Sequence, residues 1–201
     1  AGDTSGCIDN DTRHAVSALS NWRFAHSRAA VDNLVSQGFR SHNYNVGDHH
    51  IDALVDALAK ARTLPRMVDG LYYVVHMHSD TELSFRENWV LAQSVSDDLY
   101  VTGLPFVFIR PCNDLHYAAM DSIGEHHLRL ATHAYLPQAE YVSLLINSRG
   151  LIGNTSAVVI DAPFLGVPSF PVGNRQRGRE CGYRGDGTAG QQTFERLKKW
   201  L

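Results

Sequence analysis

The sequence predicts an α/β fold in which helices cover both faces of a parallel sheet. Strand-length apolar runs alternate with helix-length segments along most of the 201 residues. Two of the runs, 71–75 and 104–109, are apolar almost throughout, which is typical of strands buried on both faces. Ligands bind such sheets at the carboxyl ends of the strands, so the residues that follow the strands are the first candidates for a functional site.

The elements expected in the first third of the chain are, in order, a helix over 9–20, a short strand over 22–25, a helix from Ser27 to Gly38, a weaker strand over 44–46 and a helix over 51–62. Apolar residues three and four positions apart support the helices. Asp9 or Asn10 is suited to cap the first helix and Ser27 the second, while Gly38 is suited to end the second.

The elements expected in the rest of the chain are a strand over 71–75, a helix over 85–99, a strand over 104–109, a helix over 117–125, a strand that ends near His133, a helix over 137–146 and a helix over 188–201. Polar residues follow these strands, with His76 and His78 after the first and Asp114 and His116 after the next. Pro137 fits the first position of its helix.

Composition and charge argue against several classes of function. Hydrophobic residues make up 44% of the chain and charged residues 19%, which are the values of a globular protein. The formal net charge is −3 and no basic block is interleaved with aromatic residues, so a nucleic-acid interface is not expected. No apolar run reaches the length of a membrane span, and the first residues lack the pattern of a signal peptide. The three cysteines are far apart and odd in number, which favours reduced thiols and the cytoplasm.

The segment 149–179 carries the clearest functional signal. A short apolar run ends in the turn Gly153-Asn-Thr-Ser156, a helix-length segment and a second apolar run follow, and a loop then presents three arginines, of which Arg175 is the first. Thr155 and Ser156 are expected at a helix start, where backbone N–H groups and the helix dipole attract anions. Arginines on the next loop suit a phosphate group. The segment therefore predicts a diphosphate-binding site, and a capped helix beside a solvated loop is the alternative.

The same segment resembles the nucleotide-binding signature of the UDP-N-acetylglucosamine 2-epimerases, above all of the hydrolysing branch, which forms N-acetylmannosamine for sialic acid biosynthesis. The matching motifs follow the family's order along nearly the whole chain, so chance agreement of one short motif is a poor explanation. They are 2–20, Val46-Gly47, Ile51-Asp52, Gly153-Asn-Thr-Ser156, Asp161, Gly166-Val-Pro168, Gly173-Asn-Arg-Gln-Arg-Gly-Arg179 and Gly185-Asp-Gly-Thr-Ala189.

The chain also departs from the family pattern. The family's chains are nearly twice as long, their opening half-domain has no counterpart before Ala1, and a helix and a strand are missing between Arg179 and Gly185. Asp3 stands in place of a glutamate, and Asn10 in place of the second acid of a pair.

The resemblance implies a glycosyltransferase-B-like fold built from Rossmann-like domains. Residues 1–50 would form the carboxyl-terminal part of the first domain, and residues 51–201 the second, UDP-binding domain. The final helix, over 187–201, could pack back on the first domain.

The resemblance further implies a homo-oligomeric enzyme that converts UDP-N-acetylglucosamine to N-acetylmannosamine and UDP without a metal ion or other cofactor. Carboxylates would transfer protons and cations would stabilise the departing diphosphate. Asp3 matches the catalytic glutamate, Asp9 the first acid of the pair, and Arg13 the arginine of an Arg-His pair with His14. The alternatives are a polar terminal residue for Asp3, a helix cap for Asp9 and a surface group for Arg13.

The resemblance assigns contacts with UDP to six residues: Thr155, Ser156 and Arg175 hold the diphosphate, Asp161 the ribose hydroxyls and His78 the nucleotide, while His133 lies near the uracil-side loop. A solvated loop histidine is the alternative for His78, and a residue on the polar face of a helix is the alternative for Asp161.

Two other functions stay open. The segment His76-Met-His-Ser-Asp80 follows a strand as His-x-His-x-Asp does in metallohydrolases, which would make the chain a zinc hydrolase. Thr81, however, stands where a binuclear site of the metallo-β-lactamase kind needs a further histidine. A nucleotide-sugar-binding domain without catalysis would keep the phosphate site and lack the proton-transfer groups of the first domain.

Overall fold

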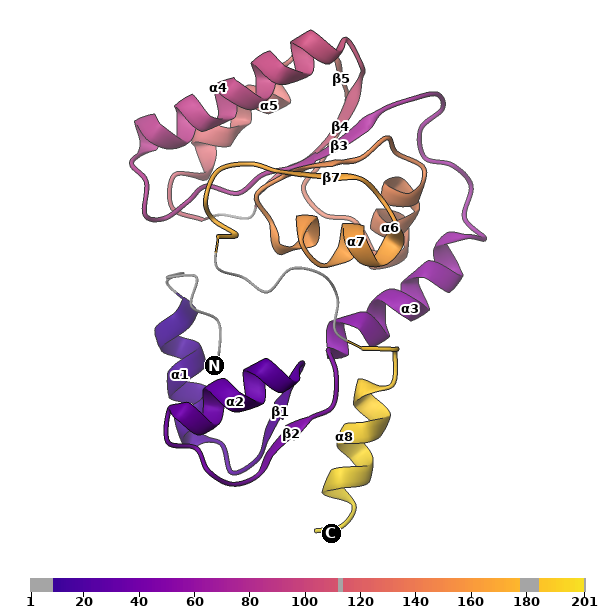
Figure 1. Cartoon of the computed structure of the whole chain (residues 1–201). Helices are drawn as coiled ribbons and strands as arrows, with labels where there is room; N and C mark the ends of the chain where they lie inside the picture. Colours follow the sequence, from indigo (N-terminus) through magenta and orange to yellow (C-terminus); the bar gives the residue numbers. More distant parts are fainter. Residues whose placement is uncertain (1–8, 112–113, 178–184, 201) are drawn as a thin grey trace. The chain divides into compact units, whose positions relative to one another are not determined.

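The computed structural model describes residues 9–111, 114–177 and 185–200, which divide into two compact units (Figure 1). The first unit lies within residues 1–59 and 178–201, and the second spans residues 60–177. Each unit has its own parallel sheet. No helix in the described part of the chain is long and apolar enough to cross a membrane.

The second unit is built on a five-stranded sheet whose strands all run parallel. The strands are β3 (Tyr73–His76), β4 (Phe106–Ile109), β5 (Arg129–His133), β6 (Leu151–Gly153) and β7 (Ser169–Pro171). Their order across the sheet is β5-β4-β3-β6-β7. Numbered from the first strand this is 3-2-1-4-5, the order of a Rossmann fold. The expected parallel sheet is confirmed.

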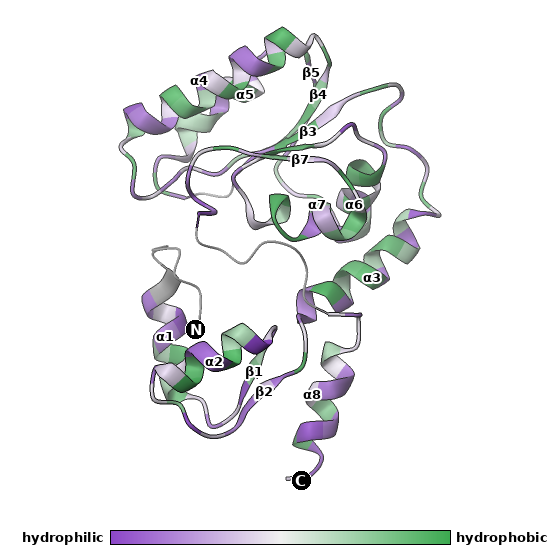
Figure 2. Cartoon of the chain, in the orientation of Figure 1, coloured by the Kyte–Doolittle hydropathy of each residue, from purple (hydrophilic) through white to green (hydrophobic). Residues whose placement is uncertain are grey.

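Helices cover both faces of this sheet (Figure 1). On one face lie α4 (Phe85–Thr102), the 3₁₀ turn η1 (Tyr117–Met120) and α5 (Asp121–Gly124), and on the other lie α6 (Gln138–Ile146), the 3₁₀ turn η2 (Ser156–Val158) and α7 (Asp161–Leu165). The helix α4 alternates between hydrophobic and hydrophilic residues along its length (Figure 2), because only one side of it packs on the sheet.

Successive residues of a strand point to opposite faces of the sheet and so belong to two separate hydrophobic cores. Val74 and Val107 belong to the core beneath α6 and α7, whereas Val75 and Phe108 belong to the core beneath α4 and α5. This division follows from the period of two residues in a strand. All four residues are at most 1% exposed, which explains why their runs lack polar residues.

The ends of α4 show how local sequence sets its length. Ser84 and Glu87 form a capping box, in which the Ser84 hydroxyl accepts from the Glu87 N–H and the Glu87 carboxylate accepts from the Ser84 N–H at 2.8 Å. Gly103 ends the helix in the left-handed conformation, with φ 62°. The helix therefore continues to Thr102, three residues beyond the predicted end.

The prediction of one continuous helix after Ser156 is wrong. The chain makes the 3₁₀ turn η2 and then a separate five-residue helix, α7. The β-branched run from Val158 to Ile160 disfavours a helix, and Pro163 is tolerated only within a first helical turn because it has no N–H to donate. The helix predicted over 117–125 is likewise divided, into η1 and the one-turn α5.

The first unit contains α1 (Asp9–Leu19), β1 (Arg23–Ala25), α2 (Arg28–Ser36), β2 (Asn43–Asn45), most of α3 (His49–Ala61) and α8 (Ala189–Leu197). The strands β1 and β2 pair in parallel. Ser27 caps α2 as predicted, with its hydroxyl accepting from the Ala30 N–H at 3.1 Å. A small core of Ala25, Ala30, Val31 and Leu34 joins the strand to α2.

The amino-terminal end of α8 is held by a carboxylate from α3. The Asp52 side chain accepts from the Ala189 N–H at 3.0 Å and from the Gly190 N–H at 2.7 Å. The first N–H groups of a helix have no partner within it, and its dipole favours a negative charge there. Asp52 thus fixes the start of α8 within the first unit.

Candidate functional site

The strand order of the second unit reverses between β3 and β6, and the region outside the carboxyl ends of these two strands is called the crevice below. From β3 the chain proceeds to β4 and β5 on one side, and from β6 it proceeds to β7 on the other. At such a reversal the loops that follow the two central strands diverge, and ligands bind outside the carboxyl ends of those strands. His76 ends β3 and Gly153 ends β6, and these two residues are partners in the register.

The two strands approach each other very closely at this point. A Cβ atom added to Gly153 would lie 2.0 Å from the carbonyl oxygen of His76 and 2.9 Å from its carbonyl carbon. Any side chain would overlap the backbone of β3. The glycine of the Gly153-Asn-Thr-Ser156 turn is therefore required by the packing of the sheet rather than by an unusual backbone angle.

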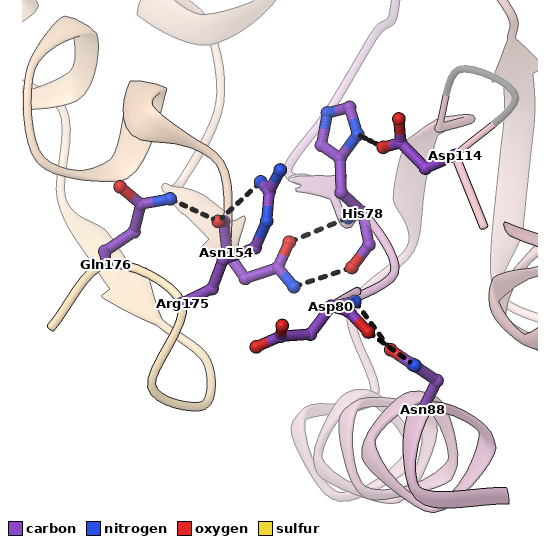
Figure 3. Close-up of polar contacts among 7 residues, drawn as sticks. All are labelled: His78, Asp80, Asn88, Asp114, Asn154, Arg175 and Gln176. Carbon is purple, nitrogen blue, oxygen red and sulfur yellow. Dashed lines mark hydrogen bonds and ion pairs between the residues drawn. The ribbon is translucent and has the colours of Figure 1, made fainter. Parts of the chain in front are cut away.

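Asn154 connects the loops that leave the two strands. Its side-chain oxygen accepts from the His78 N–H at 2.7 Å, and its side-chain nitrogen donates to the His78 carbonyl oxygen, also at 2.7 Å (Figure 3). Asn154 is only 1% exposed, so these bonds form away from water. Buried amide groups need such partners, and here both halves of the amide have one.

The arginine-bearing loop returns to the same residue. The Arg175 guanidinium donates to the Asn154 carbonyl oxygen at 3.4 Å, and the Gln176 amide donates to it at 2.7 Å. The Arg175 guanidinium and the His78 ring point to the same side of the Asn154 amide (Figure 3). A cation and an imidazole thus converge at the end of β6.

His78 is paired with a carboxylate from the loop after β4. Its Nδ1 atom lies 2.9 Å from Oδ2 of Asp114, and both side chains are mostly shielded from solvent. Burial lowers the pKa of His78, the hydrogen bond to Asp114 opposes that shift, and the charge of Arg175 adds to it. Because Asp114 engages Nδ1, a ligand would meet the other ring nitrogen, Nε2.

A second histidine lies behind the first. The ring centroids of His76 and His78 are 5.2 Å apart, and Nδ1 of His76 lies 3.3 Å from the Tyr141 hydroxyl. Burial, with smaller contributions from the charges of His78 and Arg175, lowers the pKa of His76 to about 3, so His76 is neutral near pH 7. Burial and then the charge of Asp161 raise the pKa of Tyr141, which keeps its proton.

The sequence of this chain matches the model of a known protein family. The family model of UDP-N-acetylglucosamine 2-epimerase matches residues 1–185. The chain belongs to the UDP-N-acetylglucosamine 2-epimerase family.

Curated members of the family are similar along most of this chain. The UDP-N-acetylglucosamine 2-epimerase of Neisseria meningitidis is 27% identical over 190 residues, covering 90% of this chain and 50% of that protein. The UDP-N,N'-diacetylbacillosamine 2-epimerase (hydrolyzing) of Legionella pneumophila is 25% identical over 196 residues, with coverage of 89% and 50%. The chain spans about half the length of the curated relatives it matches.

Solved structures of the family share the fold. The UDP-GlcNAc 2-epimerase of Methanocaldococcus jannaschii in complex with UDP-GlcNAc and UDP has a TM-score of 0.79 at 15% identity, covering 100% of this chain and 68% of that one. The S. aureus MnaA–UDP structure has a TM-score of 0.73 at 16% identity, with the same coverage. The fold class predicted from the sequence, α/β of the glycosyltransferase-B type, is confirmed.

Three of the six residues that the epimerase resemblance assigns to UDP lie at the carboxyl ends of β3 and β6 or on the loop that reaches them. His78 and Arg175 meet at Asn154, and Thr155 follows directly. The Thr155 hydroxyl accepts from the Ala157 N–H at 3.2 Å and so caps η2, as predicted.

The remaining candidates of the second unit lie on neighbouring elements. Ser156 is the half-buried first residue of η2, and Asp161 is the 7% exposed first residue of α7. His133 ends β5, two strands from β3 at the same edge of the sheet, where its carbonyl oxygen accepts from the Arg110 N–H.

Two of the three residues expected to be catalytic, Asp9 and Arg13, belong to the first unit. Arg13 lies half-buried on α1, together with His14. Asp9 is the first residue of α1. Asp3 lies outside the described residues.

The described residues do not provide a set of zinc ligands for the zinc hydrolase alternative. No group of three or more His, Cys, Asp or Glu side chains within them could hold a metal ion. The Asp80 carboxylate accepts from the Glu82 N–H and points away from the His78 ring (Figure 3).

The sequence indicated Asp114 as a candidate after a strand without a partner, and it indicated no role for Asn154 or Gln176. The partners of Asn154, Asp114 and Gln176 are 76, 36 and 22 residues away in the sequence. The sequence shows an apolar strand that ends in Gly153-Asn154, but this pattern does not indicate what the Asn154 amide contacts.

Proposed function

We propose that the second unit binds UDP-N-acetylglucosamine through its UDP group at the crevice between β3 and β6. Arg175, with Thr155 and Ser156, holds the diphosphate, Asp161 holds the ribose hydroxyls and His78 contacts the nucleotide. The convergence of His78 and Arg175 on Asn154 is the observation that carries this proposal. Relatives of the same fold were crystallised with UDP or UDP-GlcNAc, which supports the choice of ligand.

The electrostatics of the crevice suit an anion. A guanidinium is permanently charged, and it forms strong, directional hydrogen bonds with phosphate oxygens. A diphosphate beside His78 would raise the pKa of that histidine, because a nearby negative charge favours the imidazolium form. Asp114 on Nδ1 would stabilise the same form. Binding of UDP should therefore be accompanied by proton uptake at His78.

The proposed reaction is that of the hydrolysing branch. A base removes the C2 proton of the sugar, and UDP leaves C1 with the electrons of the C1–O bond, so that a C1–C2 double bond forms. Water then adds its oxygen to C1 while a proton returns to C2 on the opposite face. The sum is UDP-N-acetylglucosamine plus water giving N-acetylmannosamine plus UDP. Two of the curated relatives are named as hydrolyzing epimerases, which supports this choice.

In this proposal Asp3 and Asp9 transfer protons, Arg13 supports the departing phosphate and His133 lies near the uracil. Residues 1–50 then form the carboxyl-terminal part of a first Rossmann-like domain, and residues 51–201 form the UDP-binding domain, with the helix over 187–201 packing on the first domain. We place the reaction in the cytoplasm, in a homo-oligomer that supplies N-acetylmannosamine for sialic acid biosynthesis.

Incubation with UDP-N-acetylglucosamine in D₂O, followed by proton NMR, tests the reaction. The proposal predicts release of UDP together with N-acetylmannosamine that carries deuterium at C2, and loss of both products in Arg175→Ala. The matched control is Arg149→Ala, because Arg149 is an exposed arginine just before the opposite end of β6. Reversible formation of UDP-N-acetylmannosamine would contradict the hydrolysing assignment. Binding without any product would favour the non-catalytic alternative.

A further inference from the structure

We infer that Asn154 is a positioning residue of the proposed UDP site, where it fixes His78 and Arg175 relative to each other. The inference rests on the proposed function for its ligand, and on the contacts of this one residue for its geometry. Asn154 contacts the backbone of His78 with its side chain and the side chains of Arg175 and Gln176 with its carbonyl oxygen.

The side chain of Asn154 extends the pairing of β3 with β6 beyond the end of the sheet. The ladder between the strands ends where His76 pairs with Gly153. At His78, two residues beyond His76, the Asn154 side-chain amide makes the two hydrogen bonds that a neighbouring strand would make. It accepts from the His78 N–H and donates to the His78 carbonyl oxygen. The loop that carries the His78 ring is thereby fixed to the end of β6.

The chemistry of this contact requires a side-chain amide. Only a group that donates and accepts at once can satisfy both backbone groups of His78. An aspartate in the same place could accept from the N–H but would set its negative charge against the carbonyl oxygen. A leucine of similar size would leave both backbone groups of His78 without these partners.

The carbonyl oxygen of Asn154 orients the arginine. A carbonyl oxygen has two lone pairs, and here it accepts at 2.7 Å from Gln176 and at 3.4 Å from Arg175. The contact with Arg175 uses one of the five N–H donors that a guanidinium carries. It therefore directs the guanidinium to the His78 side of the crevice without using its capacity to bind a phosphate.

A second asparagine of the same unit provides a matched control. Asn88 of α4 is 0% exposed, its oxygen accepts from the Asp80 N–H at 2.7 Å and its nitrogen donates to the Asp80 carbonyl oxygen at 2.9 Å. The contact has the same form as that of Asn154, but it holds Asp80 rather than His78 (Figure 3). Asn88 also donates to the carbonyl oxygens of Leu83 and Ser84, at 3.2 and 3.1 Å, so Asn88→Asp should lower the free energy of unfolding at least as much as Asn154→Asp.

The experiment compares these two variants with the unmodified full chain at a temperature where all three are folded. Calorimetric titration with UDP should show at least about tenfold weaker binding in Asn154→Asp and a change within about threefold in Asn88→Asp. Histidine NMR titration should show a shifted pKa of His78 in Asn154→Asp alone, because the ring moves relative to Asp114.

Two results would overturn the inference: equal losses of affinity in both variants, which would show a general structural effect, or unchanged affinity and unchanged His78 signals in Asn154→Asp. If the unmodified chain does not bind UDP, the proposed function fails. The His78 signals then still decide whether Asn154 positions that residue.

Discussion

Replacing Gly153 by alanine should strongly destabilise the second unit. The added methyl group would lie 2.0 Å from the His76 carbonyl oxygen, where carbon and oxygen normally stay about 3.3–3.6 Å apart. Both sides of the contact are backbone, so no side-chain rotation relieves the overlap and β3 and β6 must separate by more than about an ångström.

The magnitude follows from the packing of these strands. Overpacking of a core costs about 1–3 kcal/mol, and we expect Gly153→Ala to reach or exceed about 3 kcal/mol because a hydrogen-bonded pair of central strands must move. The loss of backbone entropy that alanine imposes on the unfolded chain recovers at most about 1 kcal/mol of this.

Urea unfolding monitored by circular dichroism measures the effect, with Gly124→Ala as the control. A Cβ atom at Gly124 would lie 3.3 Å from the edge of the Phe108 ring and 4.0 Å from the Thr132 hydroxyl oxygen, so a shift of the ring by a few tenths of an ångström would make room for it. We expect the control to change the free energy of unfolding by less than about 1 kcal/mol. A loss below about 1 kcal/mol in Gly153→Ala would refute the steric argument.

Three further predictions concern titration and capping. The pKa of His76 is about 3 in the folded chain and 6.5 in the unfolded chain. As the pH falls below 6.5, the unfolded chain therefore takes up a proton that the folded chain does not. The free energy of unfolding should then fall by up to about 1.4 kcal/mol per pH unit. His76→Gln should make this decline shallower, and identical pH slopes for both proteins would contradict it. Asp114→Asn should lower the pKa of His78 further in an NMR titration, because the carboxylate now opposes the effect of burial; an unchanged value would show that the pair does not form. Asp52→Ala should reduce stability by about 0.5–2 kcal/mol and speed hydrogen exchange at the start of α8, and equal exchange rates would refute the cap.

The fold was predictable to the level of its layers but not of its strand order. The continuous apolar runs around Val75 and Phe108 indicated strands buried on both faces, and the structure places these residues in the core. Nothing in the periodicity states that β6 pairs with β3 rather than with β5, since that choice depends on which helices pack together. Right-handed crossovers limit the possible orders without selecting one.

The candidate site was predictable where its residues are local. Thr155 caps a turn, and that role depends on residues two positions away. The contacts of Asn154 with His78, and of Asp114 with His78, join segments that only the folded sheet brings together. The prediction of one helix after Ser156 failed because the β-branched run from Val158 to Ile160, together with Pro163, outweighs the helical spacing of the apolar residues.

Calorimetric titration of the full chain with UDP decides whether the second unit binds this nucleotide. We expect saturable binding at one site, a binding enthalpy that varies with the ionisation enthalpy of the buffer because a proton is taken up, and at least about tenfold weaker binding in Arg175→Ala but not in Arg149→Ala. No detectable binding at millimolar UDP, or equal affinity in Arg175→Ala, would contradict it.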